Sequence, residues 1–413
     1  MSAATATKPT QFTDYAHRAD PYPLYAALRE AGPVVRQDDG SYLVTTYYDI
    51  RTLANDPRLS ADPRSLTPGT GGALAQEEES NLRRSFIRLD PPEHARLRDV
   101  AMEPFGPPHS PRFIHDMRTD LTRIITGLLD AFEGKDQVDI VDEFAYQLPV
   151  AAICKILGVP HEDEGRFHVW VEKVVDSLDA GPGEDGAQRA REGDSARQEL
   201  AVYLAELIED KKRHPGEGML GTLAPQTGPG GRMSPAELVS TAALLLLAGH
   251  ETTVNLISNA TLTLLRHPDV LQRFRAEPGL AVPLVEEVLR YEPPVQFLPF
   301  FAALDDIDVA DTVIPKGSPV SLLLASGNRD PRRFEDPDRF VPDRTDNQHL
   351  SFYTGIHYCF GAALARLEAQ IALTELFRRV DGPRLVEDPP PYRQSPVLRG
   401  PRHLPLALRG VTP

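Results

Sequence analysis

The stretch that decides the fold lies near the C-terminal end and reads Ser351-Phe352-Tyr353-Thr354-Gly355-Ile356-His357-Tyr358-Cys359-Phe360-Gly361. Two glycines bracket one cysteine and allow a positive φ at little cost. The helix formers that follow, residues 362–370, predict that Cys359 lies in a tight loop just before a helix N-terminus. The helix dipole and free N–H groups there favour a thiolate, which suits a soft metal centre. Spacing alone equally allows a small buried cysteine in a turn.

Composition limits the classes of protein that this chain can be. It has 413 residues, 41% of them hydrophobic, and can bury a large core. Its two cysteines, Cys154 and Cys359, are too few for a disulfide framework, so we expect a reducing, cytoplasmic compartment. The polar residues 1–13 are neither a signal peptide nor an anchor, and the apolar residues 242–248 fall far short of the ~20 that span a membrane. A net charge of −16 argues against nucleic acid and anionic membranes as partners.

Helical patterns dominate the chain and predict a mainly α protein with small β-sheets (α+β). We expect one domain over residues 1–413 and a monomer. Residues 1–20 predict a loose arm. Short runs of β-branched and aromatic residues between turn signals predict β-rich parts within residues 20–60 and 295–325.

A long helix is predicted from residue 234 to residue 266. It begins with a capping box, Ser234-Pro235-Ala236-Glu237, and at 1.5 Å per residue it is on the order of 45–50 Å long. Its centre, Ala248-Gly249-His250-Glu251-Thr252-Thr253, puts a glycine, an acid and two hydroxyls into an apolar helix, which is costly unless they are satisfied. From the residues alone, this is either a local kink with threonines bonded to the preceding turn or a functional break.

Two charged pairs carry weaker signals. Asp90 and Glu93 predict a capping box at a helix start, and His94 and Arg98 then share one helix face, which spacing alone makes a solvated face. A Glu-x-x-Arg pattern occurs at Glu287/Arg290, and also at Glu93/Arg96 and Glu375/Arg378. Such a pair is worth only a few tenths of a kcal/mol (about 0.2–0.5) on a helix surface.

Together these segments resemble the cytochrome P450 superfamily, in its soluble bacterial class. Phe-x-x-Gly-x-His-x-Cys-x-Gly is the family's heme-binding loop, and this chain fills each fixed position with Phe352, Gly355, His357, Cys359 and Gly361. The matching segments run in consistent order from about residue 20 to the C-terminus. The resemblance implies the cytochrome P450 fold, a triangular helix-rich domain with a long central helix over the heme. It also implies heme b, with Cys359 as the axial ligand of the iron.

The resemblance also implies roles for other residues. The centre of the long helix matches the oxygen-activation segment, in which Glu251 supplies protons and Thr252 holds the bound oxygen. Glu287 and Arg290 match a buried structural pair, with Arg339 as the third member of their network. The implied heme contacts are His94, Arg98, Ala248, Gly249, Phe352, Gly355, His357, Phe360 and Gly361. The implied substrate pocket includes Leu245, Ala248, Val295, Phe297, Leu298 and Val397.

Two positions depart from the family pattern. Phe301 stands where relatives usually carry an arginine that binds a heme propionate, which leaves that role to His94, Arg98 and His357. Tyr353 stands where a small residue, often glycine, is common.

The activity that the resemblance implies is a monooxygenase that inserts one oxygen atom from O2 into a hydrophobic small molecule, such as a polyketide, macrolide, terpenoid or steroid. Nothing in the chain resembles a flavin or iron–sulfur domain, so electrons come from a separate ferredoxin and ferredoxin reductase. Two alternatives stay open. One is oxidative coupling or ring closure without oxygen insertion, and the other is a non-catalytic heme-based sensor or carrier.

Overall fold

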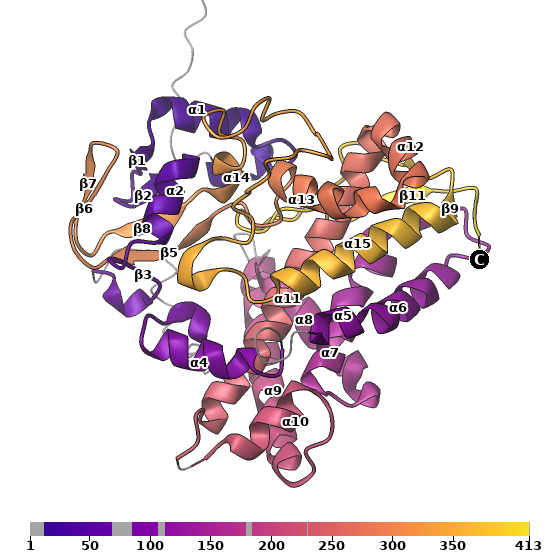
Figure 1. The fold of residues 1–413 in the computed structure, drawn as a ribbon, viewed down its shortest axis with the longest axis horizontal. Helices are drawn as coiled ribbons and strands as arrows, with labels where there is room; N and C mark the ends of the chain where they lie inside the picture. The colour runs from indigo at the N-terminus through magenta and orange to yellow at the C-terminus, as the bar shows by residue number, and fades with distance from the viewer. Residues whose placement is uncertain (1–11, 68–84, 106–111, 179–183, 229, 413) are drawn as a thin grey trace, which may run out of the picture.

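The computed structural model describes residues 12–67, 85–105, 112–178, 184–228 and 230–412. Helices dominate and give a roughly triangular outline, with α9 and α10 toward its narrow end (Figure 1). The α-helices are α1 (Tyr22–Ala31), α2 (Tyr47–Ala54), α4 (Glu93–Met102), α5 (Phe113–Asp116), α6 (Arg118–Asp130), α7 (Gln147–Leu157), α8 (Glu164–Leu178), α9 (Glu184–Arg213), α10 (Gly218–Leu223), α11 (Pro235–Arg266), α12 (Pro268–Ala276), α13 (Ala281–Tyr291), α14 (Leu324–Gly327) and α15 (Ala362–Arg379). The strands are β1 (Val34–Arg36), β2 (Tyr42–Val44), β3 (Leu59–Ser60), β4 (Gln137–Asp139), β5 (Leu298–Ala303), β6 (Ile307–Val309), β7 (Thr312–Ile314), β8 (Pro319–Leu322), β9 (Val380–Asp381), β10 (Arg384–Leu385), β11 (Pro405–Ala407) and β12 (Gly410–Val411).

The largest sheet joins distant parts of the chain. Its strand order is β1-β2-β8-β5-β3, and β2 pairs with β8 in parallel, with Tyr42 opposite Val320. The hairpin β1–β2 turns at Gly40, whose φ of 84° suits glycine. The fold class predicted from the sequence, mainly α with small β-sheets, is therefore confirmed.

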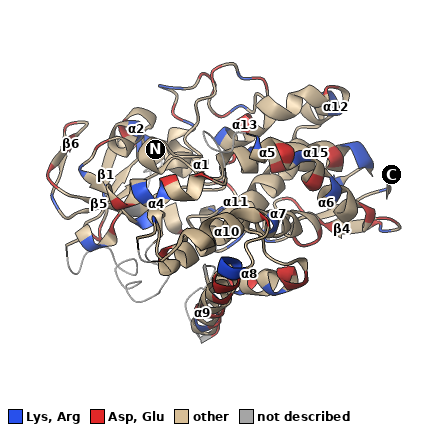
Figure 2. Ribbon diagram, turned by 60° about the horizontal axis from the view of Figure 1, so that its bottom comes forward, with Lys and Arg blue, Asp and Glu red and all other residues tan. Residues whose placement is uncertain are grey.

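The long helix α11 runs through the middle of the molecule. The predicted capping box is present, because the Ser234 hydroxyl accepts from the Glu237 N–H and the Glu237 carboxylate accepts from the Ser234 N–H. Helices α7, α9, α13 and α15 pack around it, and its ribbon is almost entirely uncharged (Figure 2). Most of its side chains are buried, so the apolar run of the sequence becomes the core.

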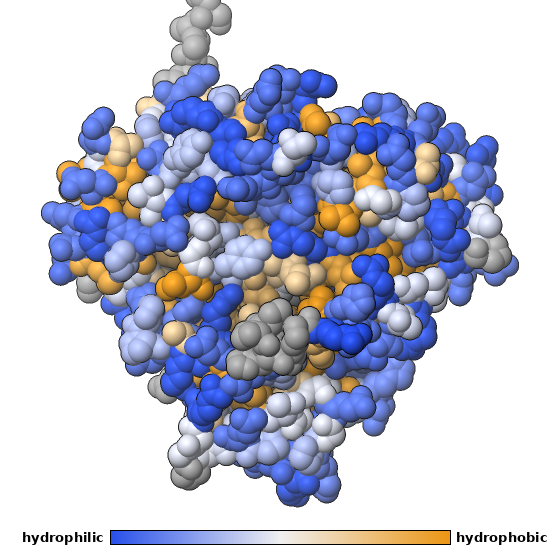
Figure 3. All heavy atoms as spheres, in the orientation of Figure 1, coloured by the Kyte–Doolittle hydropathy of each residue, from blue (hydrophilic) through white to orange (hydrophobic). Residues whose placement is uncertain are grey.

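The outer surface contrasts with this core. Hydrophilic residues dominate the face shown in Figure 3, and hydrophobic ones gather toward its middle. Within the described residues, every helix is too short or too polar to cross a lipid bilayer.

The prediction of a loose arm over residues 1–20 is wrong for its second part. Phe12 packs edge-on against Phe297 at 5.1 Å between ring centroids, and the Tyr15 hydroxyl donates to the Tyr392 carbonyl at 3.0 Å. Arg18 is 2% exposed. These partners lie almost 300 residues or more away in the sequence, so no local pattern could reveal them; residues 1–11 lie outside the described residues.

The capping box predicted at Asp90 is also wrong. Helix α4 begins at Glu93 and no side chain caps it. The Asp90 carboxylate instead accepts from the Ala61 N–H at 2.9 Å and from the Ser60 hydroxyl at 2.5 Å. Asp90 therefore connects the end of β3 to the start of α4. These tertiary hydrogen bonds replace the helix cap that the local sequence predicted.

Candidate functional site

The cysteine loop folds tightly, as its glycines predict. Gly355 has a φ of 72° and begins a 3₁₀ turn, and the Cys359 N–H donates to the Phe352 carbonyl at 2.9 Å. Helix α15 begins at Ala362, so Cys359 stands directly before a helix N-terminus, as predicted.

Opposing effects act on the protonation of Cys359. Burial raises the pKa of the Cys359 thiol, although the Gly361 N–H, Arg98 and Arg366 all act to lower it. Burial has the largest effect on this pKa, and the Gly361 N–H acts in the direction predicted for a helix N-terminus. A metal ion bound to the sulfur would displace the proton.

Aromatic rings and arginines surround the sulfur. The Phe360 ring lies 4.6 Å from that of Phe105 and 5.6 Å from that of Phe86. The Arg98 guanidinium stands 5.7 Å from the Phe360 ring, and its Nη2 donates to the Tyr358 carbonyl at 2.6 Å. Phe86 and Phe105 were missed by sequence reasoning, because an isolated phenylalanine in a helix or loop carries no positional signal.

Two histidines meet beside this loop. The rings of His94 and His357 lie 4.4 Å apart, and burial lowers the pKa of both, that of His357 to about 4. Both are therefore neutral at pH 7. The His94 Nε2 is buried and, within the described part of the chain, has no hydrogen-bond partner. An unpaired buried polar atom is costly, so a ligand group that hydrogen-bonds to it would stabilise the site.

The centre of α11 has one uncovered face. Ala248 is exposed and Gly249 and Thr252 are partly exposed, although Leu246 and Val254 on the same helix are fully buried. Among the described residues, a Cβ added to Gly249 would meet no atom within 4 Å, and the same holds at Gly361 in the cysteine loop. The helix itself is continuous, and the Thr252 hydroxyl donates to the Ala248 carbonyl at 2.8 Å, as in the local alternative expected from the sequence.

Glu251 faces away from the open side. Its Oε1 forms an ion pair with Arg393 Nε at 2.5 Å, and the two side chains are 3% and 1% exposed. Arg393 was missed by sequence reasoning, since its partner lies 142 residues earlier and no motif joins them.

These observations test whether the site fits a heme. In the described part of the chain, the site offers a cysteine sulfur, a buried imidazole nitrogen without a hydrogen-bond partner, apolar rings and two glycines with open space beside them. These features suit a flat, apolar, metal-containing group with polar substituents. The residues present fit that group.

The buried Glu287/Arg290 pair links α13 to the segment that leads to the cysteine loop. Its two side chains are fully buried and joined at 2.7 Å, and Arg290 also donates to the carbonyls of Asn328 and Pro337. Arg339 differs from the expectation, because it offers only its backbone carbonyl to Arg290, while its 73% exposed side chain pairs with Asp336. The guanidinium that approaches Glu287, at 3.4 Å, is that of Arg344.

The residues expected to line the substrate pocket differ in exposure. Leu245 is only 8% exposed, whereas Ala248 is exposed and Leu244 and Leu247, which sequence reasoning missed, are partly exposed. Phe297 is 5% exposed, because β5 and the segment before it turn its ring into a core cluster with Phe12. The remaining predicted residues, Val295, Leu298 and Val397, are partly buried.

The two departures from the family pattern contact each other. The rings of Phe301 and Tyr353 stack at 5.7 Å and 26°. Tyr353 has a φ of 58°, a conformation that favours glycine and explains why a small residue is common there. Stacking worth about 0.5–1.5 kcal/mol offsets much of the backbone strain.

We expect Gly355→Ala to destabilise the cysteine loop by roughly 1–3 kcal/mol. Its φ is positive, and an added Cβ would lie 2.5 Å from the Ala54 carbonyl oxygen at the end of α2. Chemical denaturation followed by heme absorbance and by circular dichroism measures the loss. Gly279→Ala is the matched control, because a Cβ there meets nothing within 4 Å; equal effects of the two substitutions would contradict the prediction.

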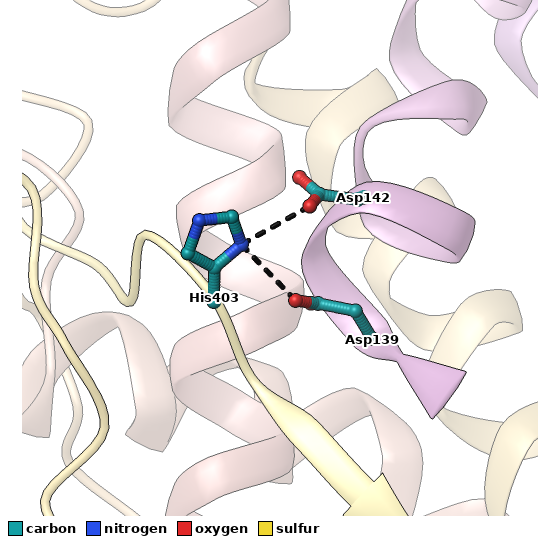
Figure 4. A group of neighbouring side chains, drawn as sticks. All are labelled: Asp139, Asp142 and His403. Carbon is teal, nitrogen blue, oxygen red and sulfur yellow. Dashed lines mark hydrogen bonds and ion pairs between the residues drawn. The ribbon is translucent and has the colours of Figure 1, made fainter. Parts of the chain in front are cut away.

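A second group of side chains capable of binding metal lies away from this site. His403 Nδ1 is 3.1 Å from both Asp139 Oδ2 and Asp142 Oδ2 (Figure 4). Asp139 Oδ1 also accepts from the N–H groups of Val141 and Leu404. These bonds already occupy the three side chains and fasten β11 to the π-helix Val141–Ala145.

Comparison with known proteins identifies the family. The cytochrome P450 family model matches residues 189–404. The cytochrome P450 monooxygenase PikC of Streptomyces venezuelae is 39% identical over 403 residues, covering 95% of this chain and 92% of that protein. The 6-deoxyerythronolide B hydroxylase of Saccharopolyspora erythraea is 36% identical over 418 residues, covering 98% and 100%.

The fold of this chain matches that of a solved structure over its whole length. The enzyme CxnD, for C–S bond formation in chuangxinmycin biosynthesis, superposes with a TM-score of 0.87 at 31% identity and covers 100% of both chains. Proteins of this class bind heme b through a cysteine thiolate and activate oxygen. The cysteine loop, the fold and these relatives agree, and the chain belongs to the cytochrome P450 family.

Proposed function

We propose that this oxygenase inserts one oxygen atom from O2 into a hydrophobic small molecule, with electrons from a separate ferredoxin and ferredoxin reductase. The observation that carries the proposal is the uncovered centre of α11, where Thr252 shares the open face with apolar residues. A thiolate-bound heme supplies electron density that favours O–O cleavage.

The proposed cofactor contacts follow from the geometry of the site. Cys359 would bind the iron, with the Gly361 N–H donating to its sulfur. Neutral His94 and His357 would each donate one N–H to the propionates, and Arg98 would add a fixed positive charge. Phe352 and Phe360 would form apolar walls.

Glu251 and Thr252 would handle protons. They are neighbours on α11, one in a buried ion pair and the other on the open face. The Thr252 hydroxyl can accept a hydrogen bond from water while it donates to the Ala248 carbonyl, so it could orient a water molecule beside the reacting oxygen. A positioned acid of this kind contributes roughly 10²–10⁴-fold to a reaction rate.

The substrate class follows from the lining and from the relatives. Leu244, Leu247 and Ala248 present an apolar surface on the open face of α11. One relative of this chain bears the name 6-deoxyerythronolide B hydroxylase. A polyketide, macrolide, terpenoid or steroid therefore suits the site better than a charged metabolite.

The proposal is tested by optical titration of the heme-loaded ferric protein with a panel of macrolides, terpenes, steroids and fatty acids. A compound that enters the site shifts the Soret band toward the high-spin form, and mass spectrometry then finds a product 16 mass units heavier. Binding followed by a product without added oxygen would contradict oxygen insertion in favour of coupling or ring closure.

We expect Thr252→Ala to uncouple oxygen consumption from product formation. Product per O2 consumed should fall by up to roughly 10²-fold, while the substrate-induced Soret shift stays unchanged. Thr261→Ala is the matched control, because its hydroxyl makes the same bond, to the Ile257 carbonyl at 2.8 Å, in a fully buried part of α11. A heme sensor or carrier would show no turnover in either protein.

A further inference from the structure

The ion pair between Glu251 and Arg393 joins the centre of α11 to a segment near the C-terminus, residues 392–401. Both side chains are almost fully buried, and Arg393 is among the largest fully buried side chains of the described residues. A buried carboxylate is costly unless a fixed cation compensates it. The chain therefore places a permanent positive charge against the acid that the proposed function uses.

The segment 392–401 is fastened along one face of α11. Glu251, Asn255 and Asn259 are spaced four residues apart and so lie on the same helix face. A Cβ on Gly400 would lie 2.1 Å from Asn255 Oδ1, and Asn259 Nδ2 donates to the Arg399 carbonyl at 3.0 Å. The ion pair, the close approach of Gly400 and the Asn259 hydrogen bond thus follow one another along α11, and the Arg393 N–H donates to the Gly400 carbonyl at 3.1 Å.

His250, the neighbour of Glu251 in the chain, cannot supply the positive charge that compensates the carboxylate. Burial lowers the pKa of His250 to about 3, and its Nε2 lies 3.1 Å from the Tyr146 carbonyl. His250 is therefore neutral at working pH and faces Tyr146, with ring centroids 4.3 Å apart. The positive charge at Glu251 comes from Arg393.

We propose that Arg393 is a positioning residue for proton delivery: it keeps Glu251 ionised and turned toward the segment 392–401, so that Glu251 can accept a proton and release it toward Thr252. The inference rests on the proposed function. In each cycle Glu251 gains a proton from solvent and loses it to the oxygen being reduced, with electrons from the ferredoxin; no bond other than O–H changes on the protein. Without Arg393, the buried Glu251 carboxylate would have no compensating guanidinium, and burial would favour its protonated form.

The first test uses infrared spectroscopy of the heme-loaded protein at neutral pH and needs no substrate. Burial raises the pKa of Glu368 to about 8, so the native protein already has the C=O stretch of one protonated carboxyl group. Arg393→Met should add a second such band, and the Glu251→Gln/Arg393→Met double variant should lose that added band. Arg393→Lys, which keeps a cation, should lack the added band. If the spectrum of Arg393→Met showed no band beyond that of the native protein, the proposal would be overturned.

The second test measures oxygen consumption and product with a plant-type ferredoxin, its reductase and a compound selected by the optical titration. Product per O2 should fall about tenfold in Arg393→Met and in Glu251→Gln, and no further in the double variant, because the two residues act as a unit. Arg393→Lys should retain most of the coupling, and the solvent deuterium isotope effect should rise only where coupling falls.

Arg402→Met is the matched control for the segment. Arg402 lies next to it, and its 35% exposed side chain pairs with Asp176 of α8 at 3.4 Å. A similar loss of coupling in Arg402→Met would show that general loosening, not the ion pair, is responsible. Failure of the proposed function would give a different pair of results. The native protein would then form no oxygenated product, while the infrared spectra of the variants would still show the expected bands.

Discussion

Cys359→Ser should lose the thiolate-type optical spectrum and all measurable oxygenase activity. Serine keeps the size and the backbone of the loop, but its hydroxyl does not ionise at pH 7 and is a poor ligand for a soft metal centre. The loop hydrogen bond from residue 359 to the Phe352 carbonyl should survive, since it uses the backbone N–H. The carbon monoxide difference spectrum of the reduced protein measures the change of ligand.

Cys154→Ser is the matched control for this experiment. Cys154 is buried in α7, where burial raises the pKa of its thiol, so it is inert core. Serine there should reduce the free energy of unfolding by about 1–3 kcal/mol and leave the thiolate spectrum intact. A retained thiolate spectrum in Cys359→Ser would refute the assignment of the ligand.

Arg290→Met should destabilise the protein by about 3–5 kcal/mol, because it leaves the fully buried Glu287 carboxylate without its guanidinium partner. It also removes donors to the carbonyls of Asn328, Pro337 and Arg339. These carbonyls lie between α13 and the cysteine loop, so heme content should fall along with stability. Urea denaturation and the heme-to-protein absorbance ratio measure both effects.

The same sequence pattern provides the control. Glu375 and Arg378 also form a Glu-x-x-Arg pair at 2.7 Å, but the arginine side chain is 52% exposed. Arg378→Met should cost no more than about 0.5 kcal/mol. If the two substitutions moved the urea midpoint equally, burial of the Glu287/Arg290 pair would have no energetic importance.

Local chemistry made several features predictable. The capping box at Ser234 depends on residues three positions apart, and the tight loop at Gly355 depends on that glycine's own φ. Predictions from local sequence failed where a side chain contacts a partner that is distant in the sequence. Asp90 accepts hydrogen bonds from Ser60 and Ala61 instead of capping a helix, and the Phe297 ring packs against Phe12.

The sequence by itself therefore determined the helix-rich class, the long central helix and the cysteine loop, because each rests on periodicity or on residues a few positions apart. The tertiary structure alone decided that Arg393 pairs with Glu251, that Arg344 rather than the Arg339 side chain approaches Glu287, and that Tyr353 stacks on Phe301. These contacts join residues about 50 to 140 positions apart. Their partners are chosen by burial, since a charge or ring removed from water must find a complement wherever the fold brings one.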